Sequence, residues 1–159
     1  MAINEQEIQN IVRSVLKGMA TNSPAEAPAS SGQKLKGIFK TADEAIAAAK
    51  AAQKEIQPMP LEFREKIIAN IRKKTLENAK MLSELAVEET GMGNVGHKII
   101  KHQLVAEKTP GTEDLSTIAW SGDRGLTLTE MGPWGVIGAV CPSTNPTCTV
   151  ICNSIGMVA

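Results

Sequence analysis

Residues 131–159 contain no charged side chain. Such a run is expected either in a membrane or in a protein interior, because exposed apolar surface is unfavourable in water. Pro142, Pro146 and Asn153 interrupt the run, so it does not have the pattern of a membrane-spanning helix. We predict instead a strand over residues 136–141, followed by a polar loop and a buried helix. A strand that is covered on both faces implies a parallel sheet.

Residues 1–19 have the pattern of an amphipathic helix, because apolar side chains recur at helical spacing and polar side chains lie between them. The apolar residues are Ile8, Ile11, Val12, Val15 and Leu16. Charged residues interrupt the segment, so it is not a secretory signal. Residues 20–36 are rich in small residues and predict a flexible linker. A short helix alone is marginal in water, so this one is expected to dock on another protein or to pack on its own domain.

The ordered domain is predicted over residues 37–159 and begins with helices. A capping box at Thr41–Glu44 opens an alanine-rich helix that prolines end. A second helical stripe starts at Leu61, and a third helix is expected to run to Thr90. Gly91 then supplies a C-terminal cap.

A further helical segment contains His97 and His102, which are five positions apart and therefore do not share a face. We interpret both as surface histidines. Farther along, the turn 122–125 leads into an alternating strand over residues 126–130. The sequence thus predicts a helical first part and a strand-containing second part.

Composition excludes several classes of function. Lys plus Arg and Asp plus Glu both number 17, and aromatic residues are scarce, so we expect no nucleic-acid binding. Cys141, Cys148 and Cys152 make an odd count without an export signal, which favours reduced thiols in a cytosolic protein. Their spacing fits no zinc site, and we interpret them as small buried residues.

The loop after the predicted strand is the best candidate for a functional site. In an α/β protein, the free N–H groups at a helix N-terminus face a ligand crevice at this place. Asn145 offers an amide donor there that can stabilise a developing oxyanion. Asparagine before proline is also a common turn former, so a purely structural role stays open.

Five motifs, in order along the chain, carry a resemblance to a known family. They are Glu89-Thr90-Gly91-Met92-Gly93, Thr109-Pro110-Gly111 with Glu113-Asp114-Leu115, Gly122-Asp123, Gly135-Val136-Ile137-Gly138 and Pro142-Ser143-Thr144-Asn145-Pro146-Thr147. The sequence resembles the CoA-acylating aldehyde dehydrogenases of ethanolamine- and propanediol-type bacterial microcompartments. Residues 1–36 are similar to the encapsulation peptide and linker of those enzymes. The resemblance covers nearly the whole chain but only about the first third of such an enzyme.

The resemblance implies an α/β aldehyde dehydrogenase fold, here a helical lead-in and the start of a Rossmann-like parallel sheet. It also implies a reaction in which a cysteine thiolate attacks an aldehyde, hydride passes to NAD, and coenzyme A releases the product as acyl-CoA. Asn145 matches the oxyanion-hole asparagine, and Pro142, Ser143 and Thr144 match a loop that borders the cofactor. The nucleophilic cysteine of the family lies beyond Ala159, so Cys141 is not assigned that role.

The partners implied by the resemblance are a short-chain aldehyde, shell proteins bound through the N-terminal helix, and further copies of the full-length enzyme, with neither nucleic acid nor membrane. The expected location is the cytoplasm, inside a microcompartment. Because a dinucleotide site needs several parallel strands, we expect these 159 residues alone to be an inactive fragment that binds NAD poorly. The alternative is a non-catalytic interaction protein whose N-terminal helix docks to shell proteins.

Overall fold

The computed structural model of the chain describes Gln6, Gln9, Arg13 and residues 37–159. The chain divides into two compact units, Met1–Ile38 and Phe39–Ala159. Within the first unit, Gln6, Gln9 and Arg13 have a helical backbone and exposed side chains. The rest of the predicted targeting helix, including its five apolar residues, and the linker as far as residue 36 lie outside the described residues.

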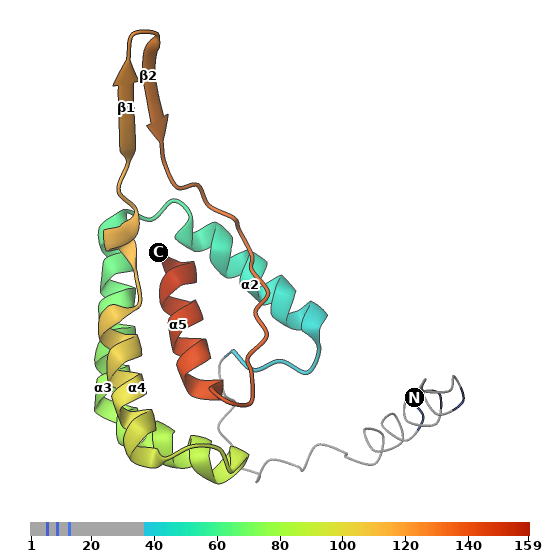
Figure 1. Cartoon of the computed structure of the whole chain (residues 1–159). Coiled ribbons are helices and arrows are strands. Elements are labelled where there is room, and N and C mark those ends of the chain that lie inside the picture. The colour runs from blue at the N-terminus through green and yellow to red at the C-terminus, as the bar shows by residue number, and fades with distance from the viewer. Residues whose placement is uncertain (1–5, 7–8, 10–12, 14–36) are drawn as a thin grey trace. The chain divides into compact units, whose positions relative to one another are not determined.

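The second unit begins with helix α2, Ala42–Ile56 (Figure 1). Its start confirms the N-cap at Thr41 and half of the predicted capping box. The Thr41 hydroxyl accepts the backbone N–H of Glu44 at 3.3 Å, which pairs a donor that the helix cannot satisfy itself. The Glu44 carboxylate accepts the backbone N–H of Lys40 at 3.1 Å, one residue before the N-cap. The helix ends before Pro58, as predicted, and none of its residues is buried.

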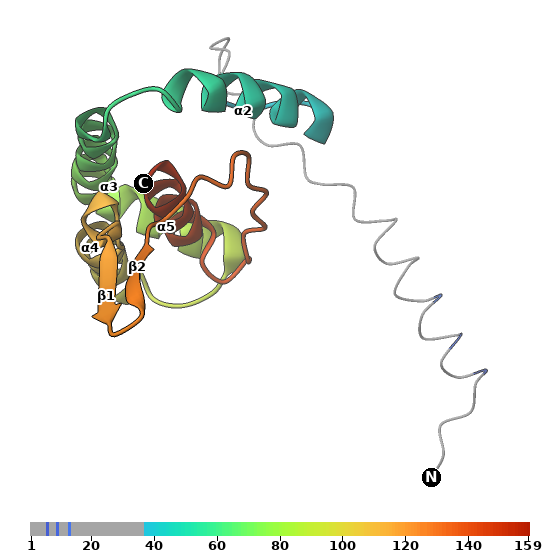
Figure 2. The same cartoon turned by 90° about the horizontal axis from the view of Figure 1, so that it is seen from above.

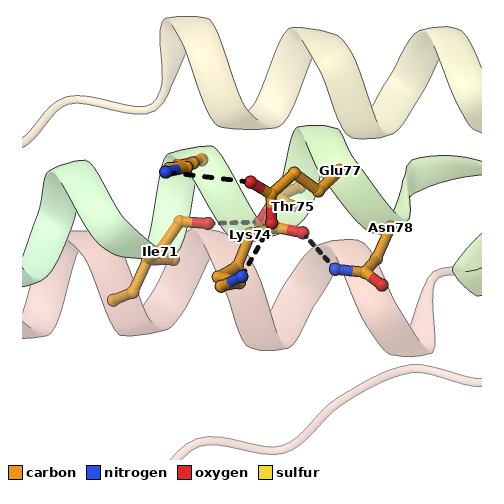
Figure 3. A network of polar contacts seen from close by, with 6 residues as sticks. Ile71, Lys74, Thr75, Glu77 and Asn78 are labelled. Carbon is orange, nitrogen blue, oxygen red and sulfur yellow. Dashed lines mark hydrogen bonds and ion pairs between the residues drawn. The ribbon is translucent and has the colours of Figure 1, made fainter.

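Helix α3, Leu61–Thr90, contains 30 residues. The prediction of two separate helices here is wrong, because the sequence between these ends has neither glycine nor proline to interrupt the backbone hydrogen bonds. Figure 3 shows contacts within its middle turns. The Thr75 hydroxyl donates to the Ile71 carbonyl at 2.8 Å, and Lys74 Nζ donates to the Glu77 carboxylate at 2.7 Å. Local pairs of this kind support a long helix over its exposed part.

Gly91 ends α3 in the left-handed conformation, with φ of 65°, and its N–H donates to the Val87 carbonyl at 2.8 Å. This confirms the predicted glycine cap. Helix α4, Val95–Lys108, follows after a short turn. The Asn94 side chain caps it by accepting the backbone N–H of His97 at 3.3 Å. The chain therefore reverses and α4 packs along α3 (Figure 2).

Helix α5, Pro146–Val158, packs on both α3 and α4 (Figures 1 and 2). Proline occupies its first turn, where no N–H is needed. The predicted helix is confirmed, but only Ile155 of it is fully buried. The apolar core of the described residues consists of Ile68, Ala79, Ala86, Ala106 and Ile155. Several of these side chains are small, so the three helices approach closely.

The predicted strand over residues 136–141 is not formed. These residues have no regular secondary structure and are exposed, and Val140 is 95% accessible. A parallel strand needs a neighbouring strand to pair with its N–H and C=O groups, and the described part of the chain provides none. Among the described helices, none combines the length and the apolar character that a membrane span requires.

Strands β1, Ile118–Gly122, and β2, Gly125–Thr129, form an antiparallel hairpin that leads away from the helices (Figure 1). The turn and the second strand were predicted, whereas β1 was not. Trp120 lies opposite Thr127 in the register. Both strands are exposed on both faces, so β1 lacks the alternation that would have marked it as half-buried.

Arg72 of α3 fixes the segment that enters the hairpin. Its Nη2 donates to the Thr109 carbonyl at 2.9 Å and to Glu113 Oε1 at 2.6 Å. Glu113 lies in the 3₁₀ helix η1, Thr112–Asp114. The hydrogen bond from Arg72 lowers the pKa of the Glu113 carboxyl. The pair therefore supports the fold above the ordinary pKa of a glutamate and loses this effect as pH falls.

Replacing Gly91 by alanine tests the helix end. A Cβ at positive φ crowds the following carbonyl, so Gly91→Ala is expected to lower the free energy of unfolding by about 1–2 kcal/mol. Gly156→Ala is the matched control, because Gly156 lies within α5 with open space around its Cα, and alanine there is expected to stabilise by about 0.5–1 kcal/mol. Urea unfolding followed by circular dichroism measures both changes. Equal changes in the free energy of unfolding for the two substitutions would contradict the assignment of Gly91 as a left-handed helix cap.

Candidate functional site

Three side chains of α4 hold the loop that opens α5. Lys98 Nζ donates to the Thr144 carbonyl at 3.1 Å, and Lys101 Nζ donates to Asn145 Oδ1 at 2.8 Å. His102 Nε2 lies 2.9 Å from the Thr147 hydroxyl. Positions i, i+3 and i+4 of a helix share one face, so a single surface of α4 contacts the loop three times. This constellation was not predicted, although the spacing of Lys98, Lys101 and His102 places them on one helix face.

Lys98 is unusual for a lysine because only 6% of its surface is accessible. Buried lysines are rare unless they are paired. Its ammonium group bonds a backbone carbonyl, and its Cε would lie 3.3 Å from a Cβ placed at Gly93. Gly93 therefore gives the lysine side chain room to reach across to the loop. The glycine of this motif thus has a role in the site besides ending the turn after α3.

His102 is fully buried, so the interpretation of it as a surface histidine is wrong. His97 is exposed, as predicted. His102 Nδ1 lies 2.8 Å from the Lys98 carbonyl and 3.0 Å from Ser83 Oγ. A carbonyl only accepts, and the Ser83 hydroxyl donates its proton to the Ala79 carbonyl at 2.6 Å. Nδ1 therefore carries a proton, and Nε2 shares a hydrogen bond with the Thr147 hydroxyl.

Asn145 occupies the N-cap position of α5 but makes no capping hydrogen bond with its side chain. Its Oδ1 accepts from Lys101, and its Nδ2 makes a weak contact of 3.4 Å with Thr144 Oγ1. The second amide hydrogen has no acceptor within the described ranges. An asparagine that is not used for capping, with its oxygen held and a donor left over, is the arrangement that an oxyanion site needs.

A shallow depression of about 360 Å³ lies beside this asparagine. It is lined by Met92, Gly93, Asn94, His97, Lys98, Lys101, Thr144 and Asn145. Two of the four predicted loop residues, Thr144 and Asn145, therefore line the depression. Pro142 and Ser143 are exposed and lie outside this lining. The depression carries positive charge, because Lys98 and Lys101 contribute to its lining.

The cysteines differ from the sequence-based interpretation. Cys141 and Cys152 are exposed rather than buried, and only Cys148 is half-buried. Burial raises the pKa of the Cys148 thiol, an effect that Lys101 and Lys98 partly oppose. A thiol with a raised pKa stays protonated and is a poor nucleophile. No group of three or more potential metal ligands occurs among the residues that the structure describes.

The comparison with known proteins gives consistent results. Residues 17–159 match the model of the aldehyde dehydrogenase family. An acetaldehyde dehydrogenase (acetylating) from Bilophila wadsworthia is 52% identical over 165 residues, which cover 100% of this chain and 34% of the relative. The chain thus matches about a third of the length of the curated relatives.

Solved structures agree with this match. The structure of a propionaldehyde dehydrogenase from the fucose utilisation microcompartment of Clostridium phytofermentans has a TM-score of 0.72 and 67% identity, covering 77% of this chain and 28% of that one. A propionaldehyde dehydrogenase of Rhodopseudomonas palustris with bound CoA has a TM-score of 0.74 and 51% identity, covering 79% of this chain and 29% of that one.

Removing the Thr147 hydroxyl tests the buried histidine network. Thr147→Val keeps the shape but leaves Nε2 of the buried His102 without its hydrogen-bond partner, so the free energy of unfolding should fall by about 1–3 kcal/mol. Thr149→Val, two residues farther along α5, is the control and should change it by less than about 0.5 kcal/mol. Urea titration gives both values. If the two variants are equally stable, the hydrogen bond between His102 and Thr147 does not stabilise the fold.

Proposed function

Because the chain belongs to the aldehyde dehydrogenase family, we propose that it forms the N-terminal third of an enzyme that oxidises a short-chain aldehyde to an acyl-CoA. The family match confirms the resemblance and the fold class that the sequence motifs indicated. Relatives named as acetylating and CoA-propanoylating dehydrogenases support the reaction type. The substrate proposed is a small aldehyde such as acetaldehyde or propionaldehyde, and coenzyme A is the acyl acceptor.

The observation that carries the proposal is the state of the Asn145 side chain. When a thiolate adds to the aldehyde carbon, the carbonyl oxygen gains negative charge. A preorganised amide N–H stabilises that charge without reorganising in the transition state. Asn145 has its oxygen bound to Lys101 and retains a free amide hydrogen among the described residues. It is therefore assigned as the oxyanion donor of the site.

The nucleophile is proposed to come from the part of the enzyme that corresponds to the remaining two thirds of the relatives. Cys148 has a protonated thiol, since burial raises its pKa. Cys141 is exposed on a segment without regular structure, so nothing orients its sulfur towards Asn145. Residues 1–159 are thus proposed to supply the hydrogen-bond donor for the oxyanion, and the remaining part of the enzyme is proposed to supply the thiolate.

NAD is the proposed hydride acceptor. Only one side of its binding site is proposed to lie in this segment, at the loop before α5. NAD would supply a hydride acceptor there, and the CoA thiol would take the acyl group and release the cysteine thiolate. Pro142, Ser143 and Thr144 are exposed, and Thr144 lines the depression; all three are proposed to line the nicotinamide side. The described residues contain a single antiparallel hairpin and no parallel sheet to hold a dinucleotide.

The N-terminal helix is proposed to dock to microcompartment shell proteins, so that the enzyme works inside the shell. Two observations favour this second role. Gln6, Gln9 and Arg13 are helical and exposed, and they occupy the predicted polar face. The similar Clostridium phytofermentans enzyme comes from a microcompartment. The apolar face of Ile8, Ile11, Val12, Val15 and Leu16 is the proposed contact surface.

Asn145→Ala tests the catalytic proposal. The variant is assayed in a chimera in which residues 1–159 are joined to the remaining two thirds of the Bilophila wadsworthia acetaldehyde dehydrogenase. Loss of one oxyanion donor is expected to lower kcat for acyl-CoA formation by about 10²–10³-fold with a small change in KM. Asn78→Ala, on the exposed part of α3, is the control and should leave kcat unchanged. A normal kcat in Asn145→Ala removes the assignment.

Deleting residues 1–19 of the same chimera tests the docking proposal. We expect kcat to persist, since the helix is not part of the catalytic unit, while co-purification with co-expressed shell proteins is lost. Ile11→Glu with Val15→Glu should have the same effect, because charges on the apolar face are unfavourable in a buried contact. Gln9→Glu, on the polar face, is the control and should retain binding. A deletion that abolishes activity instead would assign the helix to the catalytic fold.

A further inference from the structure

We propose that Lys101 is a positioning residue that sets the orientation of the Asn145 carboxamide and thereby creates the oxyanion donor. This inference rests on the proposed function, since it explains how the donor is prepared. Its physical basis is the contact of 2.8 Å between Lys101 Nζ and Asn145 Oδ1. No other described residue binds that oxygen.

The chemistry of the two groups makes the contact directional. An ammonium group has three donors and no acceptor, so it binds only the oxygen of a carboxamide. The two ends of a carboxamide are nearly equal in size, and packing alone does not select between its two orientations. With Lys101 present, the reversed orientation would place the NH₂ group against the ammonium group. The lysine therefore turns Nδ2 away from α4.

The loop around Asn145 is held independently, so the lysine acts on the side chain rather than on the backbone. Lys98 fixes the Thr144 carbonyl, and the buried His102 fixes the Thr147 hydroxyl. The Asn145 N–H also bonds the Pro142 carbonyl at 3.3 Å. Lys101 is exposed and makes none of these backbone contacts. Replacing it is expected to leave the loop in place and to free only the amide.

The positive charge strengthens the donor as well as orienting it. An ammonium group on Oδ1 draws electron density from the amide, which makes its N–H groups better donors, because hydrogen bonds in a chain polarise one another. The field of Lys101 also reaches the Cys148 thiol, whose pKa it lowers against the larger effect of burial. The oxyanion would thus form next to a donor that is both preset and polarised.

The first experiment measures the orientation in the complete 159-residue chain. The probe is the ¹⁵N-labelled side-chain amide of Asn145, observed by NMR. Lys101→Met should shift this resonance, and Lys101→Arg, which also has donors only, should restore it. Lys108→Met removes a charge from the exposed end of the same helix and should leave the resonance unchanged. An Asn145 resonance that is identical in wild type and Lys101→Met overturns the proposal.

The second experiment measures catalysis in the chimera. Lys101→Met should lower kcat by roughly tenfold, less than the 10²–10³-fold expected for loss of the donor itself, with little change in KM. The carboxylate of Lys101→Glu has acceptors only and should reverse the orientation of the amide. The decrease in kcat should therefore approach that of Asn145→Ala. Lys101→Arg should retain most of the activity.

A double-mutant cycle separates this inference from the proposed function. If Lys101 acts through Asn145, Lys101→Met should not lower kcat further in the Asn145→Ala background. If the decreases in kcat of the two single variants multiply in the double variant, the positioning role is overturned but the oxyanion assignment stands. If Asn145→Ala itself has normal kcat, the proposed function fails, while the NMR result still decides whether the lysine orients the amide.

Discussion

The buried imidazole of His102 is the interaction on which the arrangement of this segment depends. It contacts Ser83 of α3, a carbonyl of its own helix α4, and Thr147 of α5. Each of these contacts is directional, and an unpaired polar atom in this place would be costly. The apolar core around it is small, because alanine side chains supply much of it. The hydrogen bonds of one histidine therefore fix how the start of α5, and with it the candidate site, is placed on α3 and α4.

Much of the local structure could be predicted because its causes are local. Thr41, Gly91 and the turn before β2 act through their own backbone conformation and immediate neighbours, so a single sequence is sufficient to identify them. The start of α5 at Pro146 follows from the same kind of reasoning. The loop that ends in Asn145 was predicted for the same reason. Its position in the sequence was correct, although the strand expected before it is not formed.

Several of the failures share one physical cause, which is dependence on residues far away in the sequence. A strand over residues 136–141 exists only if another strand pairs with it, and the described residues offer none. The burial of His102 depends on Ser83 and Thr147, which lie 19 and 45 positions away. The lysines of α4 were overlooked because a charge on a helix ordinarily indicates solvent exposure. Lys101 and His102 follow Lys98 by three and four residues, and this spacing was visible in the sequence, but its meaning depends on which loop faces that side of the helix.

The segment before α5 is exposed and apolar, whereas the loop with the proposed donor, Asn145, contacts the helices. Trp134 and Val140 are 90% and 95% accessible, and the residues around them carry no charge. Apolar surface of this kind is stable only when other protein covers it. The helices α3, α4 and α5, in contrast, contact one another within the described residues, and side chains of α4 hold the residues Thr144–Thr147. The proposed donor, Asn145, therefore lies on a loop whose neighbours are held by α4. Such support suits an oxyanion site, because a donor contributes most when its orientation does not depend on the reacting groups themselves.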